Sequence, residues 1–157
     1  EHPIDRWSTR VVGSMARQFG AVAHYPFGGP PYAPFVSWAL ASGRAFSSPT
    51  SVMVHDTMGM MISFRGALQF DMEFDIPAPL LSESPCASCT EKPCTTACPV
   101  GAMNGDGNFM VQDCYDYIAQ TGVCVTNGCL ARGACPLSKT SGRNPEQTSH
   151  HMSYCKF

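Results

Sequence analysis

The sequence predicts an α+β protein with two lobes: a small N-terminal α/β lobe over residues 1–80 and a loop-rich lobe with short helices over residues 81–157. Two observations predict this division. Residues 76–85 read IPAPLLSESP, a mixture of proline and serine that interrupts any periodic pattern. All nine cysteines follow this segment, and the first lobe contains none. The two lobes are therefore expected to be built around different cores.

Apolar periodicity predicts the first helix. Asp5 can cap a helix that runs through Gln18, and Gly20 is a stop signal just beyond it. The apolar residues in and around this segment recur at helical spacing, namely Ile4, Trp7, Val11, Met15 and Phe19.

The remaining elements of the first lobe are shorter. We expect a strand over 21–27, a helix over 35–42 ended by Gly43, and a hairpin of two strands over 51–55 and 60–70. Methionines cluster around this hairpin and are expected to pack in the core or at a lobe interface: Met53, Met58, Met60 and Met61.

The first four cysteines form a run that ends in proline. Cys86, Cys89, Cys94 and Cys98-Pro99 read C-x2-C-x4-C-x3-C-P. This is close to the bacterial run C-x2-C-x2-C-x3-C-P, in which the cysteine before proline ligates the other cluster of a two-cluster ferredoxin. The departure is two extra residues between Cys89 and Cys94. The run predicts a bacterial-ferredoxin-like lobe that binds iron–sulfur clusters.

A second, looser quartet supplies four more thiolates. It consists of Cys114, Cys124, Cys129 and Cys135-Pro136, so that eight cysteines suit two [4Fe-4S] clusters. We favour a crosswise pairing, although the sequential one stays open. Its first cluster uses Cys86, Cys89, Cys94 and Cys135, and its second uses Cys98, Cys114, Cys124 and Cys129.

The clusters are expected to replace a hydrophobic core in this lobe. Short helices should follow Cys94 and cover residues 112–120, with Cys114 facing inward. The tail 139–157 is polar and loop-like at first, before three residues that can dock on a lobe: Met152, Tyr154 and Phe157. Cys155 is interpreted as a free thiol outside the clusters.

Structural zinc and disulfide bonds are the two alternatives to iron–sulfur clusters for these cysteines. Structural zinc also takes four cysteines, but zinc sites usually use two separated pairs rather than one crowded run. Disulfides would require a secreted chain and would leave one of the nine thiols unpaired. The sequence shows no evident signal peptide, so we expect a protein of a reducing compartment, the cytoplasm. Because the first residue is Glu1 rather than Met, a piece of a longer protein stays open.

Composition argues against two classes of partner. Charged residues make up 14% of the chain and the formal net charge is -2, with no basic stripe for nucleic acid. Apolar stretches are interrupted by Gly, Pro, Ser or His well before the length of a membrane span. Neither a nucleic acid nor a membrane span is therefore expected.

The cysteine lobe resembles the iron–sulfur module of epoxyqueuosine reductase and the reductive dehalogenases. The resemblance lies in CASCTEKPCTTACPVGAM, in Cys114 within DCYDYI, and in the final Cys129 to Cys135-Pro136. It implies two [4Fe-4S] clusters and supports the crosswise pairing. The gaps between Cys89 and Cys94, Cys124 and Cys129, and Cys129 and Cys135 are longer than in that module.

A fainter resemblance lies upstream. His55, Gly59 and Arg65 in HDTMGMMISFRGAL are similar to a segment of the cobalamin-processing decyanase and of epoxyqueuosine reductase, which bind a corrinoid on a nitroreductase-like sheet. The resemblance implies a cofactor contact for these three residues. We favour the alternative that they preserve a hairpin and its packing.

These expectations combine into an iron–sulfur electron-transfer protein, either complete or as the electron-relay part of a larger reductase, with unidentified redox partner proteins. An electron carrier is favoured over a complete enzyme. The first alternative is a corrinoid- or flavin-dependent reductase, an oxidoreductase in which cobalamin or flavin beside His55 and Arg65 is fed by the clusters. The second is a zinc-stapled interaction module.

Overall fold

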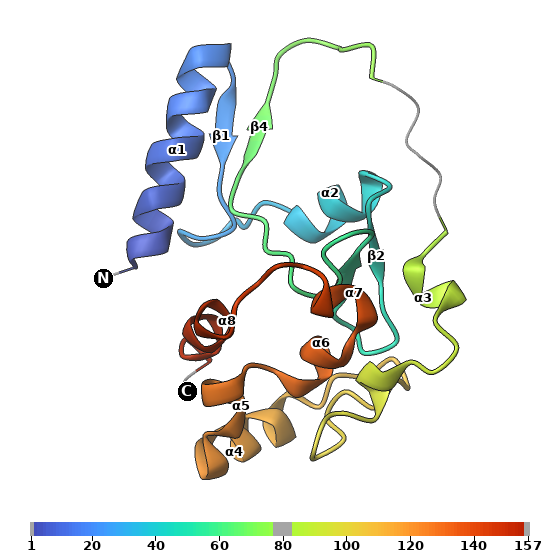
Figure 1. Cartoon of the computed structure of the whole chain (residues 1–157). Helices are drawn as coiled ribbons and strands as arrows, with labels where there is room; N and C mark the ends of the chain where they lie inside the picture. Colours follow the sequence, from blue (N-terminus) through green and yellow to red (C-terminus); the bar gives the residue numbers. More distant parts are fainter. Residues whose placement is uncertain (1, 77–82, 156–157) are drawn as a thin grey trace. The chain divides into compact units, whose positions relative to one another are not determined.

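The computed structural model describes residues 2–76 and 83–155, so the proline- and serine-rich segment lies largely outside the described residues. Helices together with short antiparallel strands confirm the mixed α+β class (Figure 1). No helix within the two described ranges is long and apolar enough to cross a membrane.

The described residues form two compact units, 2–38 with 63–76 and 39–62 with 83–155. The division differs from a single boundary near residue 80. Residues 39–62 pack with the cysteine-bearing part because their hydrophobic side chains share a core with it, as Val54 and Met60 do with Cys94 and Cys135.

The first unit contains one long helix and a two-stranded sheet. Helix α1 spans Pro3–Phe19 and ends at Gly20, whose φ of 65° lies in the left-handed region that favours glycine. The N-cap is His2 rather than Asp5, so the helix begins three residues earlier than the sequence predicts, because Pro3 suits a first helical turn. Strand β1 (Val22–His24) pairs antiparallel with β4 (Ala67–Gln69).

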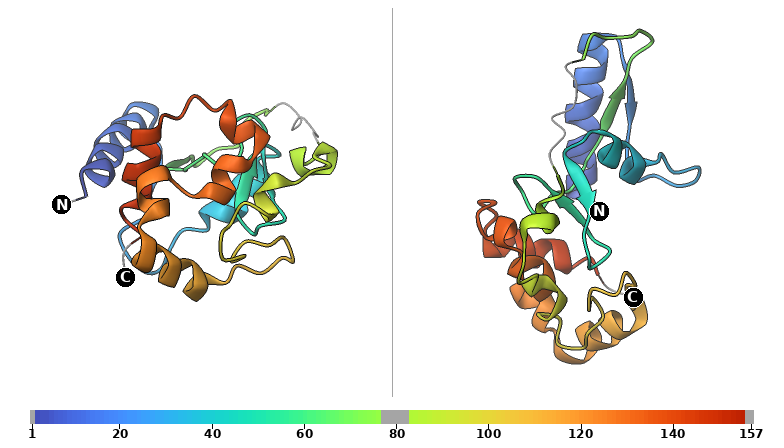
Figure 2. Two further views of the ribbon diagram at one scale, coloured as in Figure 1. Left: turned by 60° about the horizontal axis from the view of Figure 1, so that its bottom comes forward. Right: turned by 90° about the vertical axis from the view of Figure 1, so that its right-hand side faces the viewer.

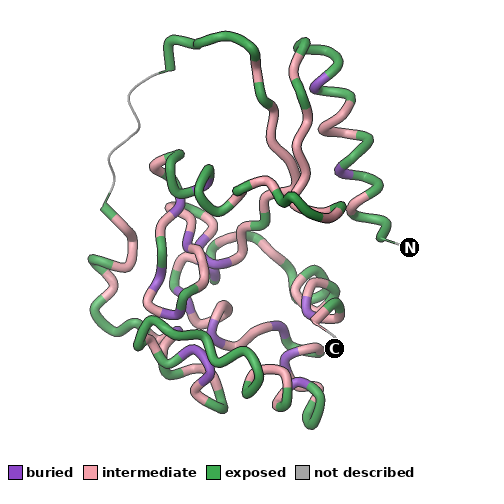
Figure 3. The backbone as a smooth tube through the Cα atoms, turned by 180° about the vertical axis from the view of Figure 1, so that it is seen from behind, coloured by how far each residue is buried: buried purple, intermediate pink, exposed green. Residues whose placement is uncertain are grey.

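The apolar residues of α1 are only partly covered. Ser8 and Ala16 are the buried residues of this helix. Figure 3 shows only short buried stretches along it. Four of the residues at helical spacing expose two fifths or more of their surface: Ile4, Trp7, Met15 and Phe19.

Strand pairing differs from the predicted hairpin. Within the second unit, β3 (Met53–His55) pairs antiparallel with β2 (Ala45–Ser47), a strand that the sequence pattern does not predict. The predicted hairpin between residues 51–55 and 60–70 is wrong, because β4 pairs with β1 instead. Only the bridge between His55 and Gly59 lies where that hairpin was expected. Helix α2 (Phe35–Ala41) lies as predicted and crosses from one unit to the other.

Short helices make up the rest of the second unit, in which no strand occurs over residues 83–155. In order they are α3 (Pro85–Ser88), the 3-10 helix η1 (Pro93–Thr95), α4 (Val111–Thr121), α5 (Val123–Asn127), α6 (Leu130–Ala134), α7 (Pro136–Lys139) and α8 (Pro145–Met152). Helix α5 packs against α4 and α8, and α6 packs against η1 and α7 (Figure 2). The helix predicted over 112–120 is confirmed as α4.

Helix α8 was not predicted in the tail. Asn144 caps it by accepting from the backbone N–H of Gln147, whose side chain accepts from the N–H of Asn144 in turn. The helix brings Met152 to 6% exposure, so this residue docks as expected, whereas Tyr154 stays 56% exposed. Phe157 lies outside the described residues.

Candidate metal centre

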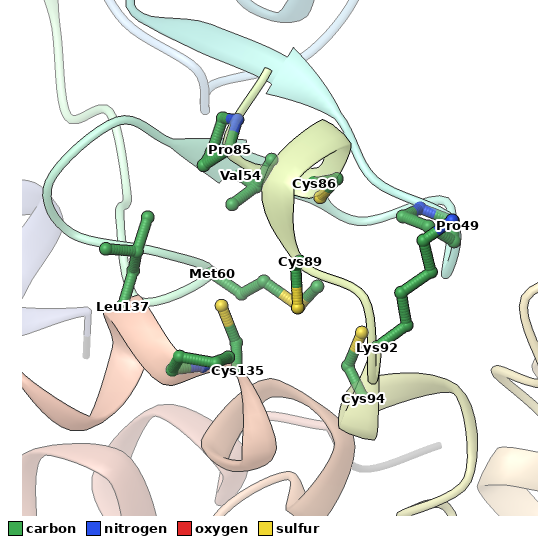
Figure 4. A pocket seen from close by; sticks show the side chains of 11 residues that line it. Pro49, Val54, Met60, Pro85, Cys86, Cys89, Lys92, Cys94, Cys135 and Leu137 are labelled. Carbon is green, nitrogen blue, oxygen red and sulfur yellow. The ribbon is translucent and has the colours of Figure 1, made fainter. Parts of the chain in front are cut away.

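A first cavity is surrounded by four cysteines from three separate segments. Cys86 and Cys89 come from α3 and its C-terminal end, Cys94 from η1, and Cys135 from the junction between α6 and α7. Figure 4 shows the four side chains around one space, with Met60 beside them. The cavity has a volume of about 50 Å³, compared with about 10–15 Å³ for a site that holds one water.

Local sequence explains how these cysteines are presented. Ser84 caps α3, since its Oγ accepts from the backbone N–H of Cys86 at 3.3 Å, and Pro85 suits the first helical turn. Pro93 and Pro136 begin η1 and α7 in the same way. The prolines thus start each short helix beside a thiol.

The wall of this cavity includes residues from far upstream. Pro49, Val54 and Met60 line it together with Leu137. The Met60 N–H donates to Ser138 Oγ at 3.0 Å, which joins this segment to α7. Gly59 permits the approach, because an added Cβ would lie 2.4 Å from the backbone nitrogen of Ser138. The sequence pattern assigned Met60 to packing and gave no sign of its place beside the cysteines.

A second cavity is surrounded by the other quartet. Its cysteines are Cys98, Cys114 on α4, Cys124 on α5 and Cys129 at the start of α6. The volume is about 20 Å³, smaller than that of the first cavity. Apolar and aromatic side chains complete its wall, among them Val100, Met103, Tyr117, Leu130 and Met152.

Two glycines shape the helices around this cavity. Gly122, at φ 65°, ends α4 and begins α5. Gly128 lies so close to α8 that an added Cβ would be 2.0 Å from Thr148 Cγ2. Ser149 Oγ also donates to the carbonyl of Val125 at 2.8 Å. These contacts hold α8, and with it Met152, against the second quartet.

The thiols of each quartet influence one another. Burial raises the pKa of Cys114 to about 11, with a further raise from Cys129, Cys98 and Cys124. Burial likewise raises the pKa of Cys94, and Cys135 and Cys86 add to the effect. Clustered, half-buried thiols thus favour their protonated form until a cation binds them.

Hydrogen bonds from backbone and hydroxyl donors lower the pKa of two of these thiols, whereas burial raises it. Although burial raises the pKa of Cys124, the N–H of Leu130 lowers it. Although burial raises the pKa of Cys86, the hydroxyl of Ser84 lowers it. Such donors stabilise a thiolate, which is how a protein tunes a bound metal group.

The structure groups the eight cysteines as the crosswise pairing has them. Cys135 lines the cavity of Cys86, Cys89 and Cys94, and Cys98 lines the other cavity. Cys155 lines neither cavity, but it packs in the cluster of Ile118, Cys124 and Met152 that borders the second one. Its pKa is raised by burial and lowered by Arg132.

The three upstream candidates do not gather in one unit. His55 and Gly59 belong to the second unit and Arg65 to the first. His55 Nδ1 is hydrogen-bonded to the Thr57 N–H at 3.3 Å and to the Met58 N–H at 3.4 Å, and thus holds a local turn.

Arg65 makes its contacts within the first unit. It donates to Asp5 and to Ser8 Oγ, and it lies over the ring of Phe27. These contacts agree with the packing interpretation of all three residues.

Sulfur is the donor type that both cavities offer to a metal. Each cavity offers four thiols and an apolar wall, to which the first adds the exposed Lys92. Over residues 2–76 and 83–155, no three His, Cys, Asp or Glu side chains are placed to hold one metal ion. A single zinc ion needs its four sulfurs about 2.3 Å from one point, whereas a cubane spreads its thiolates over four irons.

Comparison with known proteins finds no matching family model, no matching curated protein and no matching solved structure.

Proposed function

We propose that this chain is an iron–sulfur electron-transfer protein with two [4Fe-4S] clusters, one in each cysteine-lined cavity, either complete or as the electron-relay part of a larger reductase. The observation that carries the proposal is the separation of eight cysteines into two quartets around two cavities. Each quartet matches the four thiolates that one cluster takes. When bound, such a cluster accepts and releases one electron.

The chain's own residues have three tasks in this function. Cysteines hold the clusters, with Cys86, Cys89, Cys94 and Cys135 at the first centre and Cys98, Cys114, Cys124 and Cys129 at the second. Buried side chains such as Met60 and Met152 exclude water, because they expose 1% and 6% of their surface. Donors such as the Leu130 N–H tune the sulfur ligands.

Metal and sulfide analysis tests the proposal. Anaerobically prepared protein should contain about eight iron and eight sulfide per chain, and its visible absorption should bleach with dithionite. The Cys155→Ser variant is the matched control and should keep the same content, because Cys155 lines neither cavity. Colourless protein with about two zinc ions per chain would instead indicate a structural module.

A further inference from the structure

An exposed apolar patch lies beside the second cavity. It is made of four side chains that each expose about two fifths of their surface: Val100, Phe109, Met110 and Val111. The Met110 N–H donates to the carbonyl of Ala102 at 3.0 Å, which holds residues 109–111 alongside residues 100–102. Apolar side chains that gather on a surface often mark an interaction site, whereas scattered ones do not.

This patch is continuous with the wall of the second cavity. Val100 lines that cavity and is 39% exposed, and Pro99 beside it is exposed as well. None of the exposed large hydrophobic side chains in residues 2–76 and 83–155 lines the first cavity. The second centre is therefore the one with an apolar surface directly over it.

Carboxylates lie on both sides of the patch in the sequence. No Lys, Arg or His occurs over residues 93–131. The acidic residues of this segment are all exposed, namely Asp106, Asp113 and Asp116. None of the ion pairs within residues 2–76 and 83–155 involves them. The patch thus has a rim of negative charge without a neighbouring cation in the sequence.

The local contacts of these carboxylates leave the negative charge in place. Asp106 accepts from the Asn108 N–H at 2.8 Å and from Asn104 Nδ2 at 3.1 Å, and both donors lower its pKa. Asp116 accepts from Gln112 Nε2 at 2.9 Å. Neutral donors orient a carboxylate and favour its charged form, so the rim stays negative at neutral pH.

We propose that Val100 and residues 109–111, with their acidic rim, dock a one-electron redox protein whose own docking face is apolar at its centre and basic at its rim. This inference rests on the proposed function and concerns the partner of the second centre. An apolar centre with a polar rim is typical of protein interfaces, and opposite charges steer partners together. One electron leaves the cofactor of one protein and reduces that of the other, while no bond changes and no proton moves.

The negative rim disfavours other occupants of the patch. Two copies that met through this surface would bring like charges together, since a two-fold contact pairs the same patch on both copies. Nucleic acids and anionic lipids would be repelled in the same way. A basic partner is the occupant that the charges favour.

Electron transfer to a basic redox protein tests the rim. The probe is ferric cytochrome c, a basic haem protein that takes up one electron, mixed in stopped flow with reduced holoprotein freed of dithionite. The rate should fall as ionic strength rises from about 0.01 M to about 1 M, because salt screens the attraction. At low salt the Asp113→Asn/Asp116→Asn variant should react about tenfold more slowly than the native protein.

Two controls accompany this variant. Glu73→Gln/Asp75→Asn removes the same charge from exposed carboxylates of the first unit and should keep the native rate. Cys98→Ala keeps only the first cluster and should lose the fast phase of the reaction.

Phe109→Ala tests the apolar centre of the surface. Its rate should fall by about fivefold at low and at high salt alike, as for a side chain that contributes to an interface. Met72→Ala changes another exposed apolar side chain, in the first unit, and should keep the native rate.

The outcomes separate failure of the docking surface from failure of the proposed function. Native rates in the aspartate variant or in Phe109→Ala, with eight irons per chain retained, would overturn the docking surface alone. A fast phase that persists in Cys98→Ala would overturn it as well. Native protein without iron would overturn the proposed function instead.

Discussion

The two cysteine-lined cavities have the same number of thiols but different walls. The first is closed by Pro49, Val54 and Met60, which precede its first cysteine, Cys86, by 26 residues or more. Among the described residues, those that close the second all lie within 98–152, from the loop after Cys98 to Met152 on α8. One centre therefore needs a distant segment, whereas the other is built from neighbouring sequence.

This difference has an energetic consequence. Ordering a distant segment costs chain entropy, which contacts such as Met60 with Ser138 and Arg132 must offset. The second cavity depends instead on short connections between α4, α5 and α6 and on the docking of α8. We therefore expect substitutions in each wall to affect one centre and spare the other.

The largest effect is expected from removing a ligand. Cys98→Ala should lose the second cluster and keep the first, so that iron and sulfide fall to about half of the eight that two clusters require. The physical reason is that Cys98 lines the cavity of Cys114, Cys124 and Cys129. Metal analysis measures the iron and sulfide content of this variant. Retention of both clusters would contradict the crosswise pairing.

A smaller effect is expected from Gly59→Ala. The residue has φ 57°, and a new Cβ would lie 2.4 Å from Ser138 N. We expect a loss of about 2–6 kcal/mol in unfolding free energy, the sum of about 1–3 for left-handed strain and about 1–3 for overpacking. Urea unfolding measures it, and the first cluster should be lost faster to a chelator.

Gly142→Ala is the matched control for this change. Gly142 has φ 72°, but a Cβ there would meet nothing within 4 Å. The Gly142→Ala protein should lose only the part of the unfolding free energy that is due to left-handed strain, about 1–3 kcal/mol. It should keep both clusters. If the two variants lose equal stability, the close contact between Gly59 and α7 does not hold the first wall.

The smallest of the three effects is expected from Met152→Ala. The side chain is 6% exposed and lines the second cavity. Truncation should cost about 2–5 kcal/mol and should speed the release of the second cluster only. Absorption during chelator treatment measures the release, with Met152→Leu as the volume-conserving control. Faster loss of the first cluster would contradict the independence of the two walls.

Local patterns predicted the helices that have clear end signals. Gly20 and Gly43 follow α1 and α2 as expected, and the pattern over 112–120 corresponds to α4. The pairing of β4 with β1 could not be predicted in the same way. Strands of three residues carry too little apolar–polar alternation to select a partner. The register of β1 with β4 is therefore decided by contacts between residues that are distant in the chain, such as Val22 opposite Gln69. Helix α8 was missed because its polar residues lack apolar periodicity.

The sequence by itself determined which donor groups the candidate site offers, namely thiols. The number of cysteines, their spacing and the two Cys-Pro steps predict two thiolate quartets and favour their crosswise grouping over the sequential one, because ligand type and spacing are properties of the sequence. Only the tertiary structure decided which side chains close the cavities. Met60 and Met152 line the two cavities, and Cys155 packs beside the second one, through contacts between segments that are distant in sequence, and no local pattern encodes such packing.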